Sequence, residues 1–392
     1  MRLTAGGWLH SLDMPAPFES YRAEFPVLKE QLYLNHAGVA PTSLRAAAAV
    51  KAWMDDVVNH GVLNERSWEA HSEKVRGLAA RIIGASPEEV AFVRNTSHGL
   101  GLVAEGLDWR PGDEVAVATS LEYPSNVYPW QHLQSRGVAV REIPTPSGGV
   151  TPEAVASVLT PRTRLVAVSS VQFATGHRTD LEALGEVCER SGVLLCVDGI
   201  QSVGCIPVDV KRSRAHFLSA DSHKWMLGIS GIGFLYVAKD VLPRVRPALV
   251  GWRSTTDAWN FNRSHFELRA DAAKFEEGSA AYPGIYALGA ALELLLEVGP
   301  DAIGARIGEL LTRLDAGLRD LGYDVGPEPK DRAGILTFLP PGANVRALSA
   351  YLSEQKVSHS VRRGRIRLSP HFYNTHEEMD RLVDLVRAYR PG

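Results

Sequence analysis

The chain has 392 residues, a formal net charge of −3 at pH 7 and 45% hydrophobic residues, a composition that allows a sizeable globular core. This charge gives no basic surface for nucleic acid, and no apolar stretch is long enough to serve as a signal peptide or to enter a membrane. Three cysteines are too few for a disulfide framework or a zinc site, so no metal is expected and a reducing cytoplasm is favoured.

Strands that alternate with helices are predicted from residue 31 to about residue 265, after an N-terminal arm and a first helix over 1–30. Helices are predicted over 46–60, 68–83, 123–135, 152–159 and 181–191. Strands are predicted over 89–93, 114–118, 138–143, 164–169, 193–197, 217–220 and 233–237. Apolar strands in this alternation indicate a mostly parallel sheet covered on both faces.

The pattern changes after about residue 265. Helices are predicted over 286–298, 302–321, 345–354 and 375–388, with strands over 335–339, 357–361 and 365–368. Antiparallel strands with helices on one side fit a smaller α+β domain.

Two short segments carry the most specific chemistry. Asp198 stands at the end of one apolar run, in Val197–Gln201 (VDGIQ), and Lys224 follows another, in Ala220–Trp225 (ADSHKW). The two residues are 26 positions apart, about one strand-helix-strand unit, so parallel strands would direct both into one crevice. Pyridoxal phosphate (PLP) needs this pair, a lysine for the Schiff base and an acid on the pyridinium nitrogen. Most lysines are solvated surface groups, but the apolar surroundings of Lys224 favour the functional role.

Asp198 has an ordinary alternative as a cap or turn residue before Gly199. Together with Lys224, however, it favours the cofactor role, in which the acid keeps the pyridine ring protonated. Gln201, three residues later, would reach the same side of the ring and hydrogen-bond its phenolic oxygen.

Candidate phosphate and stacking groups come from three further positions. Thr96 and Ser97 precede an apolar helix, where hydroxyl and N–H groups can bind phosphate, and plain N-capping is the alternative. His223, next to Lys224, is a second phosphate candidate or a core histidine. Tyr123 would stack on the cofactor ring, or it is an ordinary buried tyrosine.

Arg367 is the candidate for a substrate carboxylate, which a guanidinium group can bind in a bidentate manner. Arg362, Arg363 and Arg365 compete for this role. Period-two alternation puts residues 363, 365 and 367 on one face, and the residues alone do not choose among them.

Together these segments resemble fold-type I PLP enzymes of the class V aminotransferase group. The likeness runs from Tyr33–Ala37 (YLNHA) to Phe372–Glu378 (FYNTHEE), and VDGIQSVG (197–204) and DSHKWMLG (221–228) are its most specific parts. It implies an α/β fold, with a mostly parallel, seven-stranded sheet in a large domain and a smaller C-terminal α+β domain. The implied domains are an arm that packs on the small domain (1–30), the PLP-binding domain (31–265) and the small domain (266–392).

The resemblance also implies a role for each matching position. Lys224 would form the Schiff base, Asp198 and Gln201 would bind the ring nitrogen and oxygen, and Tyr123 would stack on the ring as a third catalytic residue. The groups implied at the phosphate are Thr96, Ser97, His223 and, from the neighbouring subunit of a homodimer, Ser279. The groups implied at the substrate are Arg367 for the α-carboxylate, Asn35, His36 and Ser170.

Two departures bear on the reaction. Desulfurases and selenocysteine lyases of this group carry a reactive cysteine on a loop before that arginine, whereas Val361–Arg367 (VRRGRIR) has no cysteine and no room for the loop. Asp221 also stands where many desulfurases have a serine that serves the phosphate. A persulfide mechanism is therefore not expected.

We expect a cytoplasmic, homodimeric PLP-dependent enzyme that acts on an amino acid through aminotransferase chemistry, without a nucleic-acid or membrane partner. A C–S β-lyase or an epimerase of the same family is the alternative. A non-catalytic protein that binds PLP or another ligand is the alternative from a different class.

Overall fold

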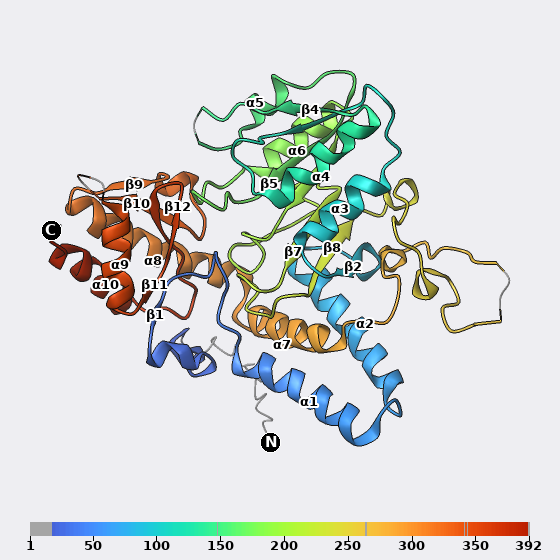
Figure 1. Cartoon of the computed structure of the whole chain (residues 1–392), viewed down its shortest axis with the longest axis horizontal. Coiled ribbons are helices and arrows are strands. Elements are labelled where there is room, and N and C mark those ends of the chain that lie inside the picture. Colours follow the sequence, from blue (N-terminus) through green and yellow to red (C-terminus); the bar gives the residue numbers. More distant parts are fainter. Residues whose placement is uncertain (1–17, 147, 263–264, 341, 343, 391–392) are drawn as a thin grey trace, which may run out of the picture.

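The computed structural model describes residues 18–390 except 147, 263–264, 341 and 343. Its centre is a seven-stranded sheet of order β2-β8-β7-β6-β5-β3-β4 (Figure 1). The strands are β2 (Val90–Val93), β3 (Glu114–Val117), β4 (Ala139–Glu142), β5 (Thr163–Ser169), β6 (Leu194–Asp198), β7 (Phe217–Asp221) and β8 (Gly233–Val237). Of these, β8 alone runs antiparallel to its neighbours, so the predicted mostly parallel sheet is confirmed.

Helices accompany this sheet as the alternating pattern predicts. All five residues of β6 and of β7 are buried, as expected for strands enclosed on both faces. Helix α3 (Thr96–Gly106) packs against β7 and β8, and α6 (Leu181–Arg190) packs against β6. The remaining helices of this part are α1 (Leu44–His60), α2 (Glu65–Ile82), α4 (Tyr128–His132) and α5 (Pro152–Ala156).

The predicted helix over 123–135 is broken in the structure. It consists of two 3₁₀ turns, Pro124–Asn126 and Leu133–Arg136, on either side of α4. The break falls at Val127, whose ψ of −55° comes with a φ of −123°, outside the helical range, between the prolines Pro124 and Pro129. Proline removes the backbone donors that a continuous helix needs.

A second, four-stranded antiparallel sheet of order β12-β13-β10-β9 lies beside the first, at the left of Figure 1. Its strands are β9 (Asp324–Gly326), β10 (Leu336–Leu339), β12 (Ser360–Arg362) and β13 (Arg365–Leu368), and its helices are α8 (Pro300–Asp320), α9 (Val345–Glu354) and α10 (His376–Ala388). The predicted strand over 357–361 is divided, because β11 (Val357–Ser358) pairs with β1 (Leu32–Tyr33) instead of with this sheet.

Helix α7 (Tyr282–Val298) begins four residues before the predicted start and packs against α1 and α2. Pro283 fits its first turn because a proline at N1 or N2 removes no intrahelical hydrogen bond. The division of the chain at residue 265 stays a prediction, and the packing of α7 on α1 and α2 favours a later division, near the start of α8.

The predicted arm over 1–30 is described only from residue 18. Residues Phe18–Glu24 and Pro26–Lys29 form two 3₁₀ helices instead of one α-helix. Arg22 forms an ion pair of 2.8 Å with Glu378 at the start of α10, and the Phe25 ring stacks on Tyr373. This segment therefore contacts the C-terminal part of the chain.

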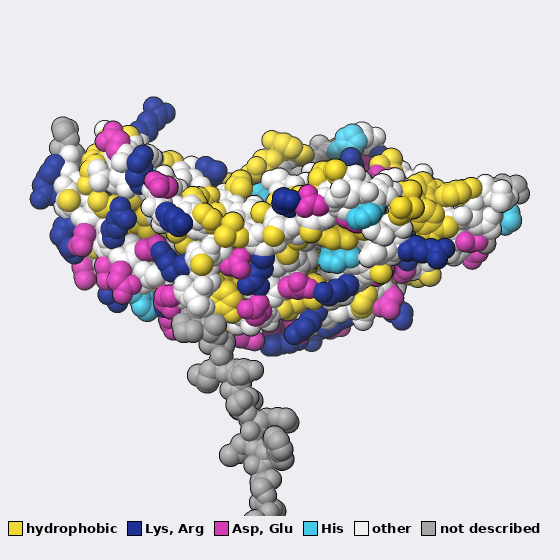
Figure 2. All heavy atoms as spheres, turned by 90° about the horizontal axis from the view of Figure 1, so that it is seen from below, with side chains coloured by type: hydrophobic (Ala, Val, Ile, Leu, Met, Phe, Trp, Pro, Cys, Tyr) yellow, Lys and Arg dark blue, Asp and Glu magenta, His cyan; other side chains and the backbone are white. Residues whose placement is uncertain are grey.

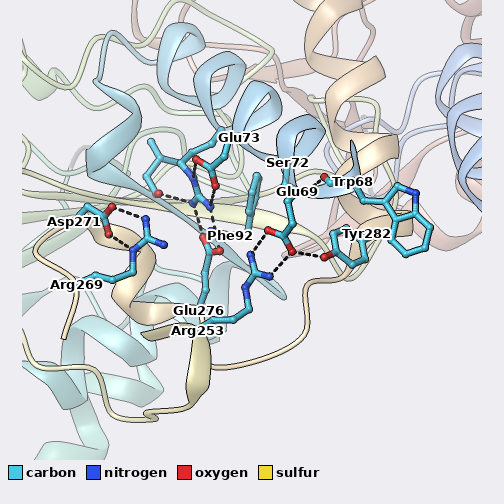
Figure 3. Close-up of polar contacts among 12 residues, drawn as sticks. Trp68, Glu69, Ser72, Glu73, Phe92, Arg253, Arg269, Asp271, Glu276 and Tyr282 are labelled. Carbon is cyan, nitrogen blue, oxygen red and sulfur yellow. Dashed lines mark hydrogen bonds and ion pairs between the residues drawn. The ribbon is translucent and has the colours of Figure 1, made fainter. Parts of the chain in front are cut away.

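The segment between β8 and α7 extends away from the large sheet and is anchored by partly buried ion pairs (Figures 1 and 3). Arg76 of α2 pairs with Glu276 and also donates a hydrogen bond to Val90 O over 2.9 Å. Arg253 pairs with Glu69 of α2, with Nη2 and Oε2 2.7 Å apart. Both ends of the segment are thus fixed to the same helix.

One face of the molecule carries charges of both signs. On the face drawn in Figure 2, Lys and Arg side chains lie among Asp and Glu side chains, without one large patch of either sign. No helix in the described part of the chain has the length and apolar character that crossing a membrane requires.

Candidate active site

A cavity of about 350 Å³ lies at the carboxyl edge of the large sheet. β2, β5, β6 and β7 run in the same direction, so the residues that follow them meet at this edge, where open α/β sheets bind ligands. The predicted residues that line the cavity are Thr96, Ser97, Tyr123, Asp198, Gln201, His223, Lys224 and Arg367.

Asp198, the last residue of β6, lies at the base of the cavity and is buried. Its Oδ1 accepts a hydrogen bond from the backbone N–H of Ile200 over 3.0 Å, so it has the turn role as well as a place in the cavity. Burial, together with the nearby carboxylate of Glu122, raises its pKa to about 7. A cationic ring nitrogen beside Asp198 would therefore stabilise its ionised form.

Lys224 lies three residues after β7, on a loop that borders the cavity. Desolvation lowers the pKa of its amine to about 8, and the cations Arg367 and Arg362 also lower it, while Asp198 opposes this shift. Its Nζ is 5.8 Å from the centre of the Tyr123 ring. An amine with this pKa is partly neutral near physiological pH, as a nucleophile or a general base must be.

Tyr123 is 46% exposed, which excludes the alternative of an ordinary buried tyrosine. Its ring meets Phe173 edge to face, with the ring centres 5.1 Å apart. The two aromatic side chains form one apolar wall of the cavity, and a planar ligand could stack on the Tyr123 ring.

The N-terminus of α3 also lines the cavity. Asn95, not Thr96 or Ser97, is the N-cap, because its side chain accepts the hydrogen bond of His98 N over 2.8 Å. The Thr96 hydroxyl instead accepts a hydrogen bond from Asp221 N over 3.1 Å, and Ser97 Oγ is 2.6 Å from Ser125 Oγ. Hydroxyl groups at the start of an 11-residue helix suit an anion such as a phosphate.

His223 lines the same end of the cavity. Its Nδ1 is 3.1 Å from Asp221 Oδ2, but neither this nitrogen nor Asp221 Oδ1 has a hydrogen-bond partner among the described residues. A buried polar atom without a partner is unfavourable, so these atoms indicate that a ligand completes this end of the site.

Arg367, on β13, enters the cavity from the small sheet and is almost fully buried. Its Nε donates to Ser360 Oγ over 3.0 Å and its Nη1 donates to Phe173 O over 2.6 Å. Its Nη2 has no partner in the described part of the chain. Burial and the neighbouring cation Arg362 lower its pKa to about 9. A carboxylate of the substrate would satisfy Nη2 and stabilise the charged form.

The structure distinguishes the competing arginines because β12 and β13 form a hairpin with a two-residue turn. Arg363 and Gly364 make this turn, both with positive φ, so Arg363 does not share the face of residues 365 and 367 as the alternation predicted. Its guanidinium group instead donates to Ser120 O. Arg365 pairs with Asp324 over 2.6 Å, outside the cavity, whereas Arg362 lines the cavity with Arg367.

Gln201 lines the cavity with an amide of fixed orientation. Trp225 Nε1 donates to its Oε1 over 2.8 Å, and its Nε2 donates to Ala37 O over 3.1 Å. An amide nitrogen carries two hydrogens, so one remains for a ligand oxygen.

Four predicted residues do not line this cavity. Both ring nitrogens of His36 are engaged, Nδ1 with Ser369 O at 2.7 Å and Nε2 with the Tyr373 hydroxyl at 2.5 Å. Asn35 forms a β-bridge with Ser369. Ser170 hydrogen-bonds Asp198 O and Ser202 Oγ and lines a separate cavity of about 380 Å³. Ser279 lines a third cavity, of about 320 Å³, so its predicted role at a neighbouring subunit stays a prediction.

Several lining residues were not assigned to the site from the sequence. They are Ala37, Gly38, Val39, Asn95, Ser125, Phe173, Ile200 and Asp221, whereas Arg362 is one of the sequence candidates for the substrate carboxylate. Asn95 precedes Thr96 directly and Ser125 is two residues after Tyr123, so their closeness in the chain to predicted site residues could have indicated them. Phe173, four residues past β5, has no sequence signal of its own, because an aromatic residue after a strand usually belongs to the core.

The three cysteines lie away from this chemistry. Cys188, Cys196 and Cys205 are all buried, and none lines the cavity. Burial raises the pKa of each thiol, of Cys188 to about 12. They are therefore protonated near neutral pH, which is the unreactive form.

Comparison with known proteins places this site in a family. The sequence model of the aminotransferase class V family matches residues 32–382. A probable cysteine desulfurase of Methanothermobacter thermautotrophicus is 30% identical, over 93% of this chain and 96% of its own length. An aminotransferase of Bacillus subtilis whose function is not characterised is also 30% identical, over 94% of this chain and 97% of its own.

Solved structures agree with the sequence relatives. The cystine C-S lyase C-DES, in complex with its reaction product cysteine persulfide, superposes with a TM-score of 0.87 at 27% identity, covering 94% of this chain and 100% of that one. A lysine-to-alanine mutant of C-DES with glycine covalently linked to its PLP cofactor gives the same TM-score at 26% identity, over 94% and 99% of the two chains.

Proposed function

Since the chain belongs to the class V aminotransferase family of PLP-dependent enzymes, we propose that it is a lyase that cleaves the C–S bond of a cysteine-derived amino acid. The absence of a cysteine thiol from the lining of the Lys224 cavity carries this proposal. A site without a thiol cannot take up sulfur from the substrate as a protein persulfide, so any sulfur released by cleavage of a C–S bond would leave with the product. The likeness to a cystine C-S lyase supports the same reaction.

The residues present fit PLP at both ends of the cavity. We assign the phosphate to Thr96, Ser97 and His223, because the helix N-terminus and the unpartnered Nδ1 meet there. Asp198 lies where it can bind a pyridine nitrogen, and Tyr123 can stack on the ring. The amine of Lys224 lies in the same cavity for the covalent attachment.

PLP, when bound, supplies an electron-accepting ring that makes the hydrogen on the α-carbon of an amino acid acidic. Arg367 would bind the substrate carboxylate through its free Nη2 and hold the amino acid in one orientation. Lys224, once released from the cofactor, would remove the proton from the α-carbon, since its pKa of about 8 leaves the amine partly neutral. Asp198 would hold a proton on the ring nitrogen.

The net reaction needs no second substrate apart from water. The C–S bond of R–S–CH₂–CH(NH₃⁺)–COO⁻ breaks, the sulfur leaves as R–SH with one proton, and the three-carbon fragment ends as pyruvate and ammonium after addition of one water. No electron is gained or lost overall, so the reaction requires no external oxidant or reductant.

A panel of amino acids tests this proposal, with pyruvate, ammonia and thiol measured in the presence and absence of a 2-oxo acid. We expect release of pyruvate from cystine or S-substituted cysteines without the 2-oxo acid. The Lys224→Ala variant should lose at least about 10³-fold of this rate, because it lacks both the covalent attachment and the base. The matched control is Lys51→Ala, at an exposed lysine of α1.

Transamination is the second candidate, and the relative named as an aminotransferase favours it. It predicts transfer of the amino group that depends on the 2-oxo acid, with no pyruvate from cystine. That outcome would overturn the lyase proposal. Racemisation of the amino acid would indicate an epimerase, and binding of PLP without turnover of any amino acid would indicate a ligand-binding protein.

We also propose that the active form is a homodimer in which Ser279 reaches the phosphate site of the partner subunit. Ser279 lies outside its own Lys224 cavity, beside Arg94 and His98 at the start of α3. Exposed apolar side chains on the extended segment support a further contact surface, namely Leu249, Val250, Trp259, Phe261 and Phe266. Sedimentation measures the oligomeric state of the holoprotein, and titration with PLP measures the affinity of a Ser279→Ala variant. A monomer together with an unchanged PLP affinity would exclude this arrangement.

A further inference from the structure

We infer that the preferred substrates of this site are amino acids whose side chain ends in an anionic group, and that Arg362 binds this group. The inference rests on the proposed function only in requiring that the cavity binds an α-amino acid. It concerns substrate class and not the bond that is broken.

Arg362 and Arg367 reach one cavity from the same hairpin. Ser360 of β12 lies opposite Arg367 of β13 and accepts its Nε hydrogen bond. Because side chains two positions apart on a strand share a face, Arg362 lies on the same face as Ser360, about 7 Å further along the strand. The hairpin thus presents two guanidinium groups to the ligand, one deep and buried, the other exposed at the mouth.

The guanidinium group of Arg362 has no acidic partner in the described part of the chain. Its Nη1 donates a hydrogen bond to the carbonyl of the preceding residue, Val361, over 2.8 Å. Its two neighbours in the hairpin are occupied, since Arg363 donates to Ser120 O and Arg365 pairs with Asp324. Arg362 is therefore the arginine of this hairpin that is available at the cavity mouth.

The charges around the cavity favour an anion at this position. Arg362 lies close enough to lower the pKa of both Lys224 and Arg367 by electrostatic repulsion. The α-carboxylate of a substrate offsets one of these cations. A second anionic group would offset another, whereas a neutral or cationic side chain would leave Arg362 unpaired or repelled.

The phosphate of the cofactor is not the partner that this geometry favours. The side chains assigned above to the phosphate come from α3 and from the loop of Lys224, which both lie next to strands of the large sheet. Arg362 comes from the small sheet together with the substrate group Arg367. Because both arginines line one cavity, an amino acid with a second carboxylate three or four bonds beyond the α-carbon, such as glutamate or S-carboxymethylcysteine, is the ligand to test.

Binding to the holoenzyme tests the inference without any C–S bond. The change in the absorbance of the bound cofactor is titrated with glutamate, and with glutamine as a neutral analogue of the same shape. We expect glutamate to half-saturate the wild-type enzyme at a concentration roughly tenfold to a hundredfold lower, the range for a hydrogen bond between charged groups. Equal affinities in the wild type would overturn the inference.

Two variants and one control locate the effect. Arg362→Gln should bind glutamate and glutamine alike, and Arg362→Glu should prefer ornithine to glutamate. Arg365→Gln, which removes the same charge from the same hairpin outside the cavity, should keep the wild-type preference. A preference for glutamate that persists in Arg362→Gln would also overturn the inference, and the wild-type titration stands even if this variant fails to fold.

The outcomes separate this inference from the lyase proposal. If glutamate binding depends on Arg362 but no cysteine derivative yields pyruvate, the substrate class stands and the lyase fails. If pyruvate forms and S-carboxymethylcysteine is no better a substrate than its amide, the lyase stands and the substrate class fails.

Discussion

The indole Nε1 of Trp225 donates a hydrogen bond to Gln201 Oε1 over 2.8 Å and so joins the loop that carries Lys224 to the loop that follows Asp198. Both loops leave adjacent parallel strands, and this buried contact fixes one against the other. It also sets the orientation of the Gln201 amide, whose oxygen is used by the indole, so that the nitrogen faces Ala37 and the cavity.

Trp225→Phe should therefore weaken PLP binding by about tenfold, because the aromatic packing remains while the hydrogen bond is lost and the amide can turn over. Titration of the apoprotein with PLP measures this affinity. Trp109→Phe is the matched control, since Trp109 Nε1 donates to Ala104 O away from the cavity. An unchanged affinity in Trp225→Phe would show that the Gln201 amide does not contact the cofactor.

The attachment of PLP to the apoprotein should depend on pH through Lys224. Only the neutral amine attacks the aldehyde, and the pKa of Lys224 is lowered to about 8, so the rate should rise with pH and level off above about pH 8. Stopped-flow absorbance measures this rate, with N-acetyl-lysine as the reference amine. A rate that keeps rising to pH 10, as for the free amine, would contradict the burial of Lys224.

Asp198→Asn keeps the size of the side chain and the acceptor for Ile200 N, but it removes the charge. We expect roughly a 10²-fold lower turnover with PLP still bound, the usual cost of one lost electrostatic contact at a reacting group. Asp198 raises the pKa of Lys224, so its removal should move the plateau of PLP attachment to lower pH. A plateau that moves to higher pH would contradict this electrostatic relationship.

Thiol reagents should not inhibit the native enzyme. Cys188, Cys196 and Cys205 are buried, with thiol pKa values raised by desolvation, so iodoacetamide should react slowly and leave turnover unchanged. Mass spectrometry counts the alkylated thiols, and the urea-unfolded chain, in which all three react, is the control. Rapid inactivation that substrate prevents would indicate a catalytic thiol after all.

Arg76→Met should lower the free energy of unfolding by about 3 kcal/mol, because Glu276 would be left buried without its cation. Phe92 N would still donate to this carboxylate, which moderates the loss. Urea unfolding measures the change, with Lys51→Met in the exposed pair with Asp55 as a control expected to stay within about 0.5 kcal/mol. Equal unfolding midpoints for the two variants would contradict the role assigned to this network.

The strands of the large sheet could be predicted because each buried strand is a run of consecutive apolar residues. The run over 164–169 became β5 and the run over 193–197 became β6, each within a residue or two. The direction of β8 could not be predicted, because an apolar strand has the same pattern whether it runs parallel or antiparallel. The division of 357–361 between two sheets likewise depends on a partner, β1, more than 300 residues away in the chain.

The chemistry-bearing positions of the site were accessible from the sequence where they end a strand or begin a helix. Asp198 ends β6 and Thr96 begins α3, and they meet Lys224, three residues after β7, in the cavity. The sequence does not single out Arg362 among the arginines, because period-two alternation does not reveal the turn at Arg363, which the positive φ of this residue shows. His36 and Ser170 fit the pattern of a relative, but their hydrogen bonds inside the fold could not be seen without it.

The turn at Arg363 and Gly364 is also a point at which extra residues could be inserted with a small loss of stability. Lengthening a surface loop costs only about 0.6 kcal/mol for each doubling, and the strand that follows the turn, β13, has its register fixed by pairing with β10. A segment inserted there would hang over the cavity while Arg367 stayed in place. A change in the length of this turn could therefore bring new reactive side chains to the cavity. The residues that bind the substrate would not have to change.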